Sequence, residues 1–388
     1  MRMTLIDPEM RNLELIKEGV GPFLFYQYFG YKVSFVYYEN GAYPYLDSLL
    51  KGIDLKFIDR PQNQQGSKDR SLKKIFGNSV VAYLKTNAPT IDVLHLIGFS
   101  KETLVYAYVY KLYNKKGICY VKCDADYGMV DIDYIKNSLK RNFLKYFFNK
   151  VDFYSVESTP VLNALTNKYP NVLKGLIKFP VPCFFLPPAR IKSDVKKEKI
   201  ILTVARIGAY QKNTELLLRA FSRLQGEDWS LVLVGPLENL NFNQELLSIL
   251  KKSPALESRI LLTGEITDRE ELFNWYQKSS IFCLPSRHES FGIALLEAAY
   301  FGCFPITTGI KEIPAAYDIT NNWEYGAQIS NDNEDDLLKA LEKITSSDFD
   351  LERIRTGKDI SIYIESNIMG KKTIEKLHEL FLIKIEKS

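Results

Sequence analysis

Short apolar runs alternate along this chain with longer segments in which apolar residues recur every three or four positions. Runs such as IILTVA and LVLVG are continuously aliphatic, which is typical of parallel strands buried on both faces. The intervening segments, for example Thr214–Leu224 and Asp268–Gln277, have the periodicity of amphipathic helices. The strands that this pattern predicts are Lys32–Tyr38, Leu55–Asp59, Val93–Ile97, Ile118–Lys122, Phe153–Val156, Ile200–Ala205, Leu231–Val234, Ile260–Thr263, Ile281–Leu284 and Pro305–Thr307. Strands that alternate with helices predict an α/β protein with doubly wound parallel sheets.

The alternation breaks over Phe179–Lys199, where the ten residues FPVPCFFLPP contain four prolines and a charged stretch follows. Proline removes a backbone donor and fixes φ, so we expect an ordered, non-helical connector between two similar α/β domains. The length of 388 residues also suffices for two domains that each bury a core. We therefore predict domains over residues 1–182 and 183–365, followed by a helix over residues 366–388 that could pack back on the first domain.

Composition narrows the class of protein. The 51 Lys and Arg against 47 Asp and Glu give a net charge of +4, too weak a bias for a nucleic-acid-binding protein. The five cysteines are scattered without a C-x-x-C pair, and with only three histidines beside them we expect no metal site. Free thiols are typical of a reducing compartment. The first residues are charged where a signal peptide would be apolar, and no apolar run is long enough to span a membrane. These features predict a cytoplasmic protein.

The segment with the most chemical information is Pro285–Pro305, PSRHESFGIALLEAAYFGCFP. It follows a predicted strand, and open α/β sheets bind ligands at the carboxyl ends of their strands. A helix is expected to begin there, with its first amides and the positive end of its dipole directed at the ligand. The residues expected to open this helix and to contact the ligand are Ser290, Phe291, Gly292 and Ile293.

Two glutamates accompany the start of this helix. Glu289 would precede it at the cleft wall, and Glu297 would lie about one and a half turns into it. A carboxylate in such a place can accept hydrogen bonds from two adjacent hydroxyls, as on a ribose or a hexose. The alternative is an amphipathic helix with one capping acid and one solvated glutamate, which the Pro-Ser before and the Gly-x-Pro after the segment make less favourable.

The arrangement Glu289-SFGIALL-Glu297 resembles the E-x7-E signature of retaining nucleotide-sugar glycosyltransferases of the GT-B fold, glycosyltransferase family 4. The segments TVARIGAYQKNTELLLRAF and LLTGEITDREELFNWYQKSSIFCLPS resemble the same family, and the resemblance is weaker over residues 10–180. It implies the GT-B fold, in which two Rossmann-like, doubly wound parallel-sheet domains face each other across a cleft. The first domain would hold the acceptor and the second the nucleotide sugar.

The resemblance also implies a role for each matching residue. In the family the first glutamate lies beside the donor sugar and the second binds the nucleotide ribose, which match Glu289 and Glu297. An arginine and a lysine neutralise the diphosphate, which implies Arg206 and Lys212 as catalytic residues together with Glu289. Five residues separate this pair where four are common in the family, and Gly208 could absorb the extra residue beside the donor. The alternative for the pair is a solvated loop with two cations.

A glycine pair precedes the apolar, aromatic helix candidate FLFYQYF in the first half, as Gly19-Val20-Gly21-Pro22. In the family an N-terminal glycine-rich loop packs near the donor phosphate and the acceptor, so the resemblance implies Gly21 as a donor contact. The alternative is an ordinary turn, since a lone G-x-G is weak evidence. A dinucleotide-binding fingerprint is excluded because the third glycine and the acidic strand end are missing.

The acceptor side departs from the family pattern at ICYVKCDADY. Cys123 stands where the family often carries a histidine close to the reacting sugar. Asp124 and Asp126 could bind acceptor hydroxyls or cap the next helix, and both interpretations stay open. His95, in DVLHLIGFS, matches a family position of variable role and is a further acceptor-side candidate, with a structural histidine as the alternative.

Residues 131–150 combine a stripe of isoleucine, leucine and phenylalanine with five basic residues. A basic amphipathic helix can lie on an anionic membrane surface, so this segment is a candidate for peripheral contact with the inner face of the plasma membrane. The alternative is a helix that packs its apolar stripe on the sheet and leaves its charges in water.

Together these features predict a retaining, metal-independent hexosyltransferase without a cofactor. It would move a hexosyl group from a nucleoside diphosphate sugar, with UDP favoured, to a glycan or lipid-linked acceptor in cell-surface polysaccharide, glycolipid or glycoprotein synthesis. Two alternatives stay open. One is a nucleotide-sugar epimerase or sugar phosphorylase on the same fold. The other is a catalytically silent GT-B subunit that supports a partner transferase, which Cys123 in place of the histidine suggests.

Overall fold

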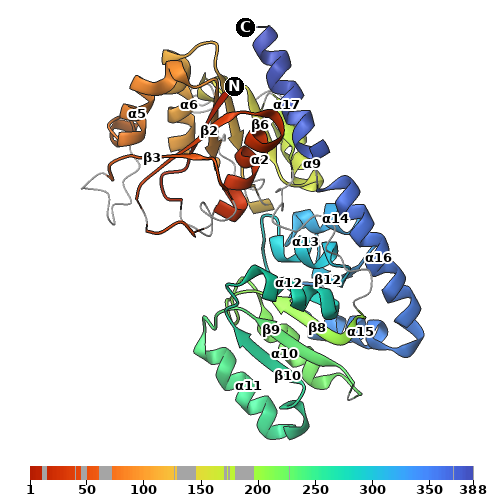
Figure 1. Cartoon of the computed structure of the whole chain (residues 1–388). Helices are drawn as coiled ribbons and strands as arrows, with labels where there is room; N and C mark the ends of the chain where they lie inside the picture. Colours follow the sequence, from red (N-terminus) through yellow and green to blue (C-terminus); the bar gives the residue numbers. More distant parts are fainter. Residues whose placement is uncertain are drawn as a thin grey trace. The chain divides into compact units, whose positions relative to one another are not determined.

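The aliphatic runs of the sequence form the central strands of two parallel sheets in the computed structural model of the chain (Figure 1). The chain divides into two units, each described by itself below. Unit 1 comprises Met1–Glu157, Val161–Phe185 and Met369–Ser388, and unit 2 comprises Ser158–Pro160 and Leu186–Ile368. The structure describes residues 1–10, 15–39, 41–44, 50–60, 72–125, 127–128, 146–169, 173, 175–179, 196–226, 228–369 and 371–387.

The sheet of unit 1 has seven strands in the order β3-β2-β1-β4-β5-β6-β7, all of them parallel. These strands are β1 (Arg2–Ile6), β2 (Lys32–Tyr37), β3 (Asp54–Phe57), β4 (Val93–Ile97), β5 (Ile118–Lys122), β6 (Phe153–Val156) and β7 (Leu176–Lys178). The chain winds outward from β1 to β3 and then returns to place β4 on the other side of β1. This reversal is the doubly wound topology that the sequence predicts.

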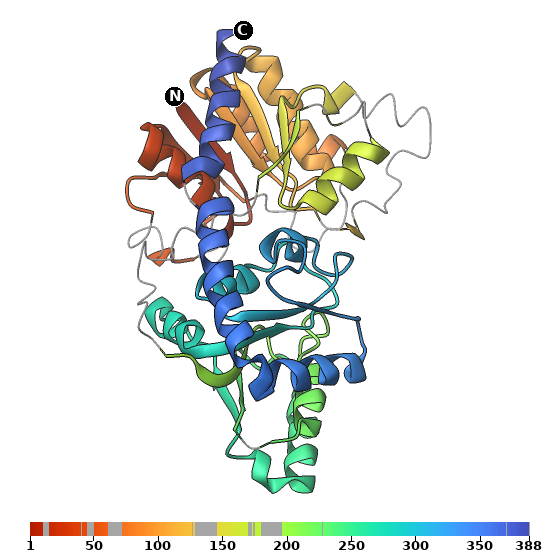
Figure 2. The same ribbon diagram turned by 90° about the vertical axis from the view of Figure 1, so that its right-hand side faces the viewer.

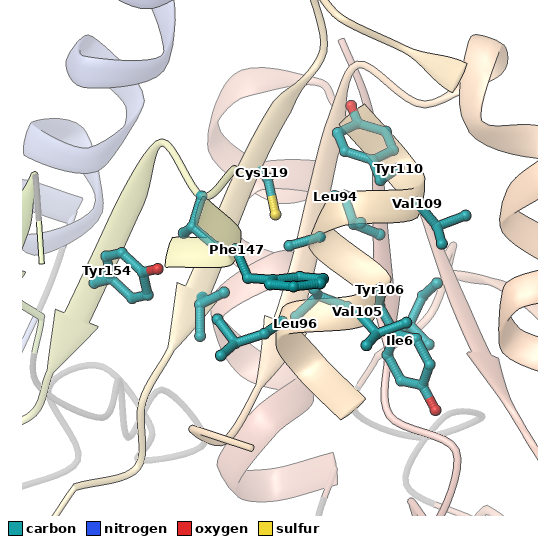
Figure 3. Close-up of a cluster of buried hydrophobic side chains, with 14 of the residues drawn as sticks. Ile6, Leu94, Leu96, Val105, Tyr106, Val109, Tyr110, Cys119, Phe147 and Tyr154 are labelled. Atoms are coloured by element: carbon teal, nitrogen blue, oxygen red, sulfur yellow. The ribbon is translucent and has the colours of Figure 1, made fainter. Parts of the chain in front are cut away.

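Helices cover both faces of this sheet. They are the π-helix η1 (Leu15–Gly19) and the α-helices α2 (Val20–Phe29), α4 (Leu72–Phe76), α5 (Ser79–Asn87), α6 (Lys101–Tyr113), α9 (Thr159–Lys168) and α17 (Lys371–Glu386), with a short 3-10 turn at Ala88–Thr90. Side chains alternate between the faces because successive residues of a strand point in opposite directions. Leu94 and Leu96 of β4 pack with Val105 and Val109 of α6 in one core (Figure 3), whereas Val93 belongs to the core on the opposite face.

The opposite face is covered by α2 and by α17, which lie side by side (Figure 2). Phe381 of α17 is fully buried and stacks on Phe25 of α2 with 5.5 Å between ring centroids. His378 stacks on Phe29 at 3.9 Å, and its Nδ1 lies 2.9 Å from the hydroxyl of Tyr31. The helix at the end of the chain is therefore an integral part of the core of unit 1.

The sheet of unit 2 has six parallel strands in the order β10-β9-β8-β11-β12-β13. These strands are β8 (Glu198–Val204), β9 (Ser230–Val234), β10 (Ile260–Gly264), β11 (Ser279–Leu284), β12 (Phe304–Thr308) and β13 (Ala327–Ile329). The α-helices are α10 (Thr214–Arg223), α11 (Leu240–Lys252), α12 (Arg269–Lys278), α13 (Ile293–Tyr300), α14 (Pro314–Ile319), α15 (Glu334–Thr345) and α16 (Asp350–Asn367), with 3-10 turns at Pro254–Leu256 and Ser347–Phe349. Leucines of α10, α11 and α15 share one core with β8, β9 and β11. Both units thus have the doubly wound α/β architecture that the hydrophobic pattern predicts.

All ten predicted strands are confirmed, with ends that differ from the observed bounds by at most two residues. The prediction that Gly19-Val20-Gly21-Pro22 forms a loop ahead of a helix is wrong, because α2 begins at Val20 and Gly19 closes the π-helix. Proline is tolerated in the first turn of a helix, where its missing N–H has no intrahelical partner. Val20 and Leu24 are also fully buried, so their packing favours continuation of the helix through the glycines.

A buried ion cluster lies at the carboxyl edge of the unit 1 sheet. The Nζ of Lys122, at the end of β5, lies 2.9 Å from Oε2 of Glu18 and 3.2 Å from Oε1 of Glu157, and none of the three side chains is more than 5% exposed. Burial alone would lower the pKa of Lys122, but the two carboxylates together raise it above its ordinary value. The second oxygen of Glu157 also accepts a bond from the backbone N–H of Ala125 at 3.3 Å. One cation thus holds two carboxylates from different elements at this edge.

His95 of β4 lies near this cluster, with its ring centroid 4.6 Å from that of Tyr120. Burial and the neighbouring Lys122 charge lower the pKa of His95 to about 3. Its Nε2 is buried without a hydrogen-bond partner among the described residues. His95 is therefore neutral in the folded protein at physiological pH, whereas the same side chain in an unfolded chain would titrate near pH 6.5.

Replacing Lys122 should destabilise unit 1 strongly. Lys122→Met leaves two buried carboxylates without their cation, and we expect a loss of about 3–5 kcal/mol in the free energy of unfolding. The control is Lys56→Met, which removes the exposed Lys56–Asp54 pair of the same unit and should change stability by about 0–1 kcal/mol. Urea unfolding of both variants measures the difference. Equal effects of the two substitutions would show that the buried cluster does not stabilise the sheet edge.

The stability of unit 1 should fall as the pH drops below about 6.5. Below that pH, His95 is protonated in the unfolded chain but stays neutral in the folded chain. The free energy of unfolding therefore falls by about 1.4 kcal/mol for each pH unit, until the pH approaches the pKa of His95 in the folded protein. His95→Phe removes this titration and keeps a ring against Tyr120. We therefore expect a smaller loss of stability between pH 7.5 and 5.5 in the variant than in the native chain, measured by urea unfolding at each pH. Parallel pH profiles would contradict the assignment of a neutral buried histidine.

Candidate functional site

The residues predicted to bind a nucleotide sugar converge where the strand order of unit 2 reverses. β9 and β10 lie on one side of β8, and the chain returns to pair β11 with its other side. Ligands of open α/β sheets bind in the crevice at the carboxyl ends of the strands at such a reversal. The loop 206–213 follows β8 and the loop 285–292 follows β11, so the two predicted segments leave the sheet as neighbours.

Glu289 is the centre of the polar contacts between these loops. Its side chain is nearly buried, and its Oε1 lies 2.5 Å from Nζ of Lys212 and accepts the hydroxyl of Ser286 at 2.8 Å. Its Oε2 accepts a longer bond from Gln211 at 3.4 Å. The backbone N–H of Glu289 donates to the carbonyl of Glu312 at 2.7 Å. A carboxylate removed from water needs this kind of compensation, and here it fixes the side chain beside a cation.

Arg206 lies at the exposed end of the same network. Its guanidinium binds both carboxylate oxygens of Glu238 at 2.8 Å and donates to Oε1 of Gln211 at 2.9 Å. Gln211 donates in turn to the carbonyl of His288 at 2.8 Å. The loop thus presents two cations, one half-exposed at Arg206 and one largely buried at Lys212. The structure brings Arg206, Lys212 and Glu289 together as predicted.

The loop between the two cations depends on unusual backbone geometry. Gly208 has a φ of +78°, and its N–H donates to the hydroxyl of Thr214 at 2.9 Å. Asn213 has a φ of +51° and is fully buried immediately before α10. Glycine and asparagine are the residues that adopt such left-handed conformations most easily. The loop 206–213 thus has left-handed residues at Gly208 and Asn213.

The helix expected after Glu289 is α13, and it begins at Ile293 with Gly292 as its N-cap. Gly292 has a φ of +81°, which a residue with a Cβ adopts only under strain. Phe291 is buried, and Ser290 is partly exposed just ahead of the helix. The N–H of Leu295 donates to the carbonyl of Gly292 at 2.9 Å, so the amides of Ile293 and Ala294 are the first amides that have no partner within the helix. The chain therefore provides an anion-binding geometry next to Lys212 and Glu289.

Glu297 lies inside α13 and is also buried, with 3% of its surface exposed. It forms an ion pair with Arg269 of α12, whose guanidinium lies 4.7 Å from the centre of the Phe273 ring. Burial, followed by the Glu297 charge, raises the pKa of Tyr276 well above its usual value. Glu297 is therefore fixed by an arginine from the neighbouring helix.

The sequence prediction does not single out the partners of these carboxylates. Arg269 is 28 positions from Glu297, and Gln211 is 78 positions from Glu289. Glu238 and Ser286 likewise carry no motif of their own. Adjacency of β8 with β11 brings Gln211 to Glu289, adjacency of β8 with β9 brings Glu238 to Arg206, and adjacency of α12 with α13 brings Arg269 to Glu297. The sequence offers only one signal for such partners, which is a polar residue that lies close in sequence to a motif residue. Ser286 and Gln211 have this signal.

The predicted residues of unit 1 have separate environments. Gly21 lies in the first turn of α2, and His95 lies inside β4. Asp124 follows β5 with a φ of +49°, a strained conformation for a non-glycine residue. Burial raises the pKa of Cys123 above its usual range, which keeps this side chain in the thiol form. Asp126 lies outside the described residues.

The remaining predictions concern a metal, a membrane and the connector. Among the described residues, no group of three or more His, Cys, Asp or Glu side chains has a geometry suited to a metal ion. None of the helices in the described ranges has both the length and the apolar character needed to cross a bilayer. Most of the predicted basic helix, residues 131–145, lies outside the described residues, as do residues 180–195 of the connector.

Comparison with known proteins shows what the sequence of unit 2 is similar to. Residues 189–358 match the protein family described as "Glycosyl transferases group 1". The "GDP-mannose:cellobiosyl-diphosphopolyprenol alpha-mannosyltransferase" of Xanthomonas oryzae pv. oryzae (strain PXO99A) is 27% identical over 154 residues, 39% of this chain and 39% of that protein. The "Lipopolysaccharide core biosynthesis mannosyltransferase LpcC" of Rhizobium leguminosarum bv. viciae is 34% identical over 93 residues, 23% of this chain and 25% of the relative. The matches thus span well under half the length of these curated relatives.

Solved structures extend the similarity in fold to the whole chain. A glycosyltransferase from Rickettsia africae ESF-5 superposes with a TM-score of 0.76 at 16% identity, over 100% of this chain and 99% of that one. Anabaena Alr3699/HepE, solved in complex with UDP and glucose, gives a TM-score of 0.69 at 13% identity, over 98% of this chain and 99% of the other. The chain therefore has the GT-B fold, and residues 189–358 of its second unit match the glycosyl transferases group 1 family.

Proposed function

We propose that this protein transfers a hexosyl group from a nucleoside diphosphate sugar to a hydroxyl of a glycan or lipid-linked glycan acceptor, with retention at the anomeric carbon. The observation that carries the proposal is the nearly buried Glu289 carboxylate, held by Lys212 directly before the N-terminus of α13. A fixed cation and the positive end of a helix dipole both attract a negatively charged leaving group. The match of residues 189–358 to group 1 glycosyltransferases supports the same reaction class.

The charges in the two loops suggest how the leaving group departs. When the bond between the anomeric carbon and the diphosphate oxygen breaks, negative charge develops on that oxygen. Lys212, Arg206 and the first amides of α13 would stabilise this charge without rearranging in water. Arginine suits two-pronged contact with phosphate oxygens, and lysine acts as a compact point charge. In this proposal the protein cations neutralise the diphosphate, so the reaction proceeds without a metal ion.

Retention follows if the acceptor attacks from the face that the diphosphate leaves. The new bond joins the acceptor oxygen to the anomeric carbon, and the hydroxyl proton passes to the departing phosphate oxygen. The protein then needs no separate general base, which agrees with a site whose principal carboxylate already pairs with Lys212. Glu289 would accept a hydroxyl of the donor sugar and stabilise positive charge on its ring. Glu297, fixed by Arg269, would accept the ribose hydroxyls.

Relatives and neighbours suggest the classes of donor and acceptor. The name of one matching protein specifies GDP-mannose as donor and a diphosphopolyprenol-linked acceptor, and another neighbour was solved with UDP and glucose. Other relatives are named for lipopolysaccharide core biosynthesis, for amylovoran biosynthesis and as a serotype-specific mannosyltransferase. We therefore propose a role in cell-surface polysaccharide, glycolipid or glycoprotein glycan synthesis, with UDP- and GDP-sugars as the first donors to test.

The purified chain should bind one nucleotide sugar in the absence of acceptor. A ligand at 100 times its dissociation constant adds about 2.7 kcal/mol to the stability of the folded state, a clear rise in melting temperature. The measurement is a thermal-shift screen against UDP-, GDP-, ADP- and dTDP-sugars, with EDTA present to test metal independence. Absence of a response to every donor at millimolar concentration would contradict the proposed donor site.

Glu289→Gln should abolish most turnover while leaving donor binding measurable. Loss of one positioned charge in an active site lowers the rate by about 10²–10³-fold. The control is Glu257→Gln, an exposed residue of unit 2 that directly follows the 3-10 turn Pro254–Leu256 outside the candidate site, and this variant should turn over like the native chain. Release of nucleoside diphosphate in the presence of acceptor measures the rate. A native chain that binds donor but never releases product would instead favour the silent-subunit alternative.

A further inference from the structure

Tyr210 is an exposed aromatic residue in the loop that carries Arg206 and Lys212. Its side chain is 76% exposed, although it lies one residue from Gln211, which contacts the nearly buried Glu289. This ring lies beside a site otherwise built of paired charges, and it does not belong to the hydrophobic core of unit 2. Its surface is available for a ligand.

The ring is held in place in spite of its exposure. The guanidinium carbon of Arg287 lies 4.3 Å from the ring centroid, and Nη1 of the same arginine donates to the carbonyl of Tyr210 at 2.6 Å. The backbone N–H of Arg287 donates to the carbonyl of Gln211 at 2.8 Å. One face of the ring is thus covered by a cation, and only the other face is available for stacking.

A second set of contacts holds the arginine itself. Arg287 pairs with Asp332 at 2.7 Å, and Asp332 accepts the side-chain amide of Asn213 at 3.0 Å. Asn213 ends the loop that contains Tyr210, so the network ties this loop to the segments after β11 and β13. A side chain with two rotatable angles, held in this way, loses little entropy when a ligand covers it.

The position of Tyr210 identifies the part of the substrates that it would meet. It neighbours the Glu289 end of the site, whereas the proposed ribose contact, Glu297, lies farther along α13. A nucleobase would bind beyond the ribose and so away from Tyr210. The donor sugar would lie against Glu289, which is 8% exposed, whereas Tyr210 faces solvent. The molecule that approaches this site from solvent is the acceptor.

Resting on the proposed function, we propose that Tyr210 is a stacking platform for a saccharide ring of the acceptor. The C–H face of a pyranose is apolar and weakly positive, and the face of an aromatic ring is negative, so the two surfaces attract and exclude water. Arg287 and Asp332 are positioning residues for the ring. Tyr210 would thus select acceptors that present a hexose, rather than a bare lipid or peptide hydroxyl, at the transfer point.

The test is saturation-transfer NMR of the full chain with methyl α-D-mannopyranoside, methyl β-D-glucopyranoside and cellobiose. The samples contain the nucleoside diphosphate that the thermal-shift screen identifies. If the screen identifies none, UDP and GDP are used in parallel. We expect at least one saccharide to bind the native chain and Tyr210→Phe equally, and Tyr210→Ala about tenfold more weakly, since aromatic stacking contributes up to about 1.5 kcal/mol. The control is Tyr113→Ala, which removes an exposed tyrosine from unit 1 and should bind like the native chain.

Three results would overturn the platform. They are equal saccharide binding by Tyr210→Ala and the native chain, no binding of any of the three saccharides to the native chain, and loss of the donor-induced thermal shift in Tyr210→Ala. The last result would assign Tyr210 to the donor. Failure of the proposed function has a different signature, because no donor then shifts the melting temperature of the native chain.

Discussion

The arrangement of the candidate site depends on one constraint, which is that a buried carboxylate needs partners to offset its loss of hydration. Glu289 is held almost out of water, where an unpaired negative charge would be strongly unfavourable, and its compensation comes from both loops at the reversal of the sheet. Lys212 reaches it from the loop after β8 and Ser286 from its own loop after β11. The pairing of β8 with β11 brings Lys212 to Glu289, whereas Ser286 is only three positions from Glu289 in the same loop. A change that separated these strands would leave the carboxylate without its cation.

The same constraint recurs at the other polar positions. Glu297 is buried in α13 and paired with Arg269 of α12, and in unit 1 Lys122 is buried between Glu18 and Glu157. In each case partners distant in the sequence meet where secondary structure elements pack. Buried ion pairs contribute little net stability when replaced as a whole, but losing one member is costly. These buried ion pairs therefore fix the positions of their side chains more than they stabilise the fold. A protein whose site depends on charges in fixed places benefits from this.

The sequence predicts the strands well and the contacts between loops poorly. The central strands, such as Val93–Ile97 and Ile118–Lys122, consist mostly of apolar residues, and their observed bounds agree with the prediction. β1 was not predicted because Arg2 and Thr4 interrupt its apolar pattern, and β7 and β13 are only three residues long. Local turn chemistry favours a loop at Gly19–Pro22, whereas the burial of Val20 and Leu24 favours the helix that the structure has there.

The sequence predicts the motif residues of the site but not the residues that pair with them. The spacing of Glu289 and Glu297 is local, so the helix and its two acids follow from the sequence. Arg269 and Asp332 belong to other elements, and their proximity depends on strand order and helix packing. The orientation of Tyr210 depends on a guanidinium 77 positions away. Long-range pairings of this kind have no signature in a single sequence.

The association of α17 with unit 1 has a consequence for synthesis of the protein. In chain order unit 2 is an insertion, because residues of unit 1 both precede and follow it. During translation the sheet of unit 1 emerges first, yet the apolar face built by Tyr120, Phe25 and Tyr31 stays uncovered until Ile374, Leu377 and Phe381 arrive. Unit 2 can fold in the interval. Of the two units, the one whose synthesis begins first is thus the last to be completed, with an exposed aromatic surface that a chaperone could recognise while synthesis continues.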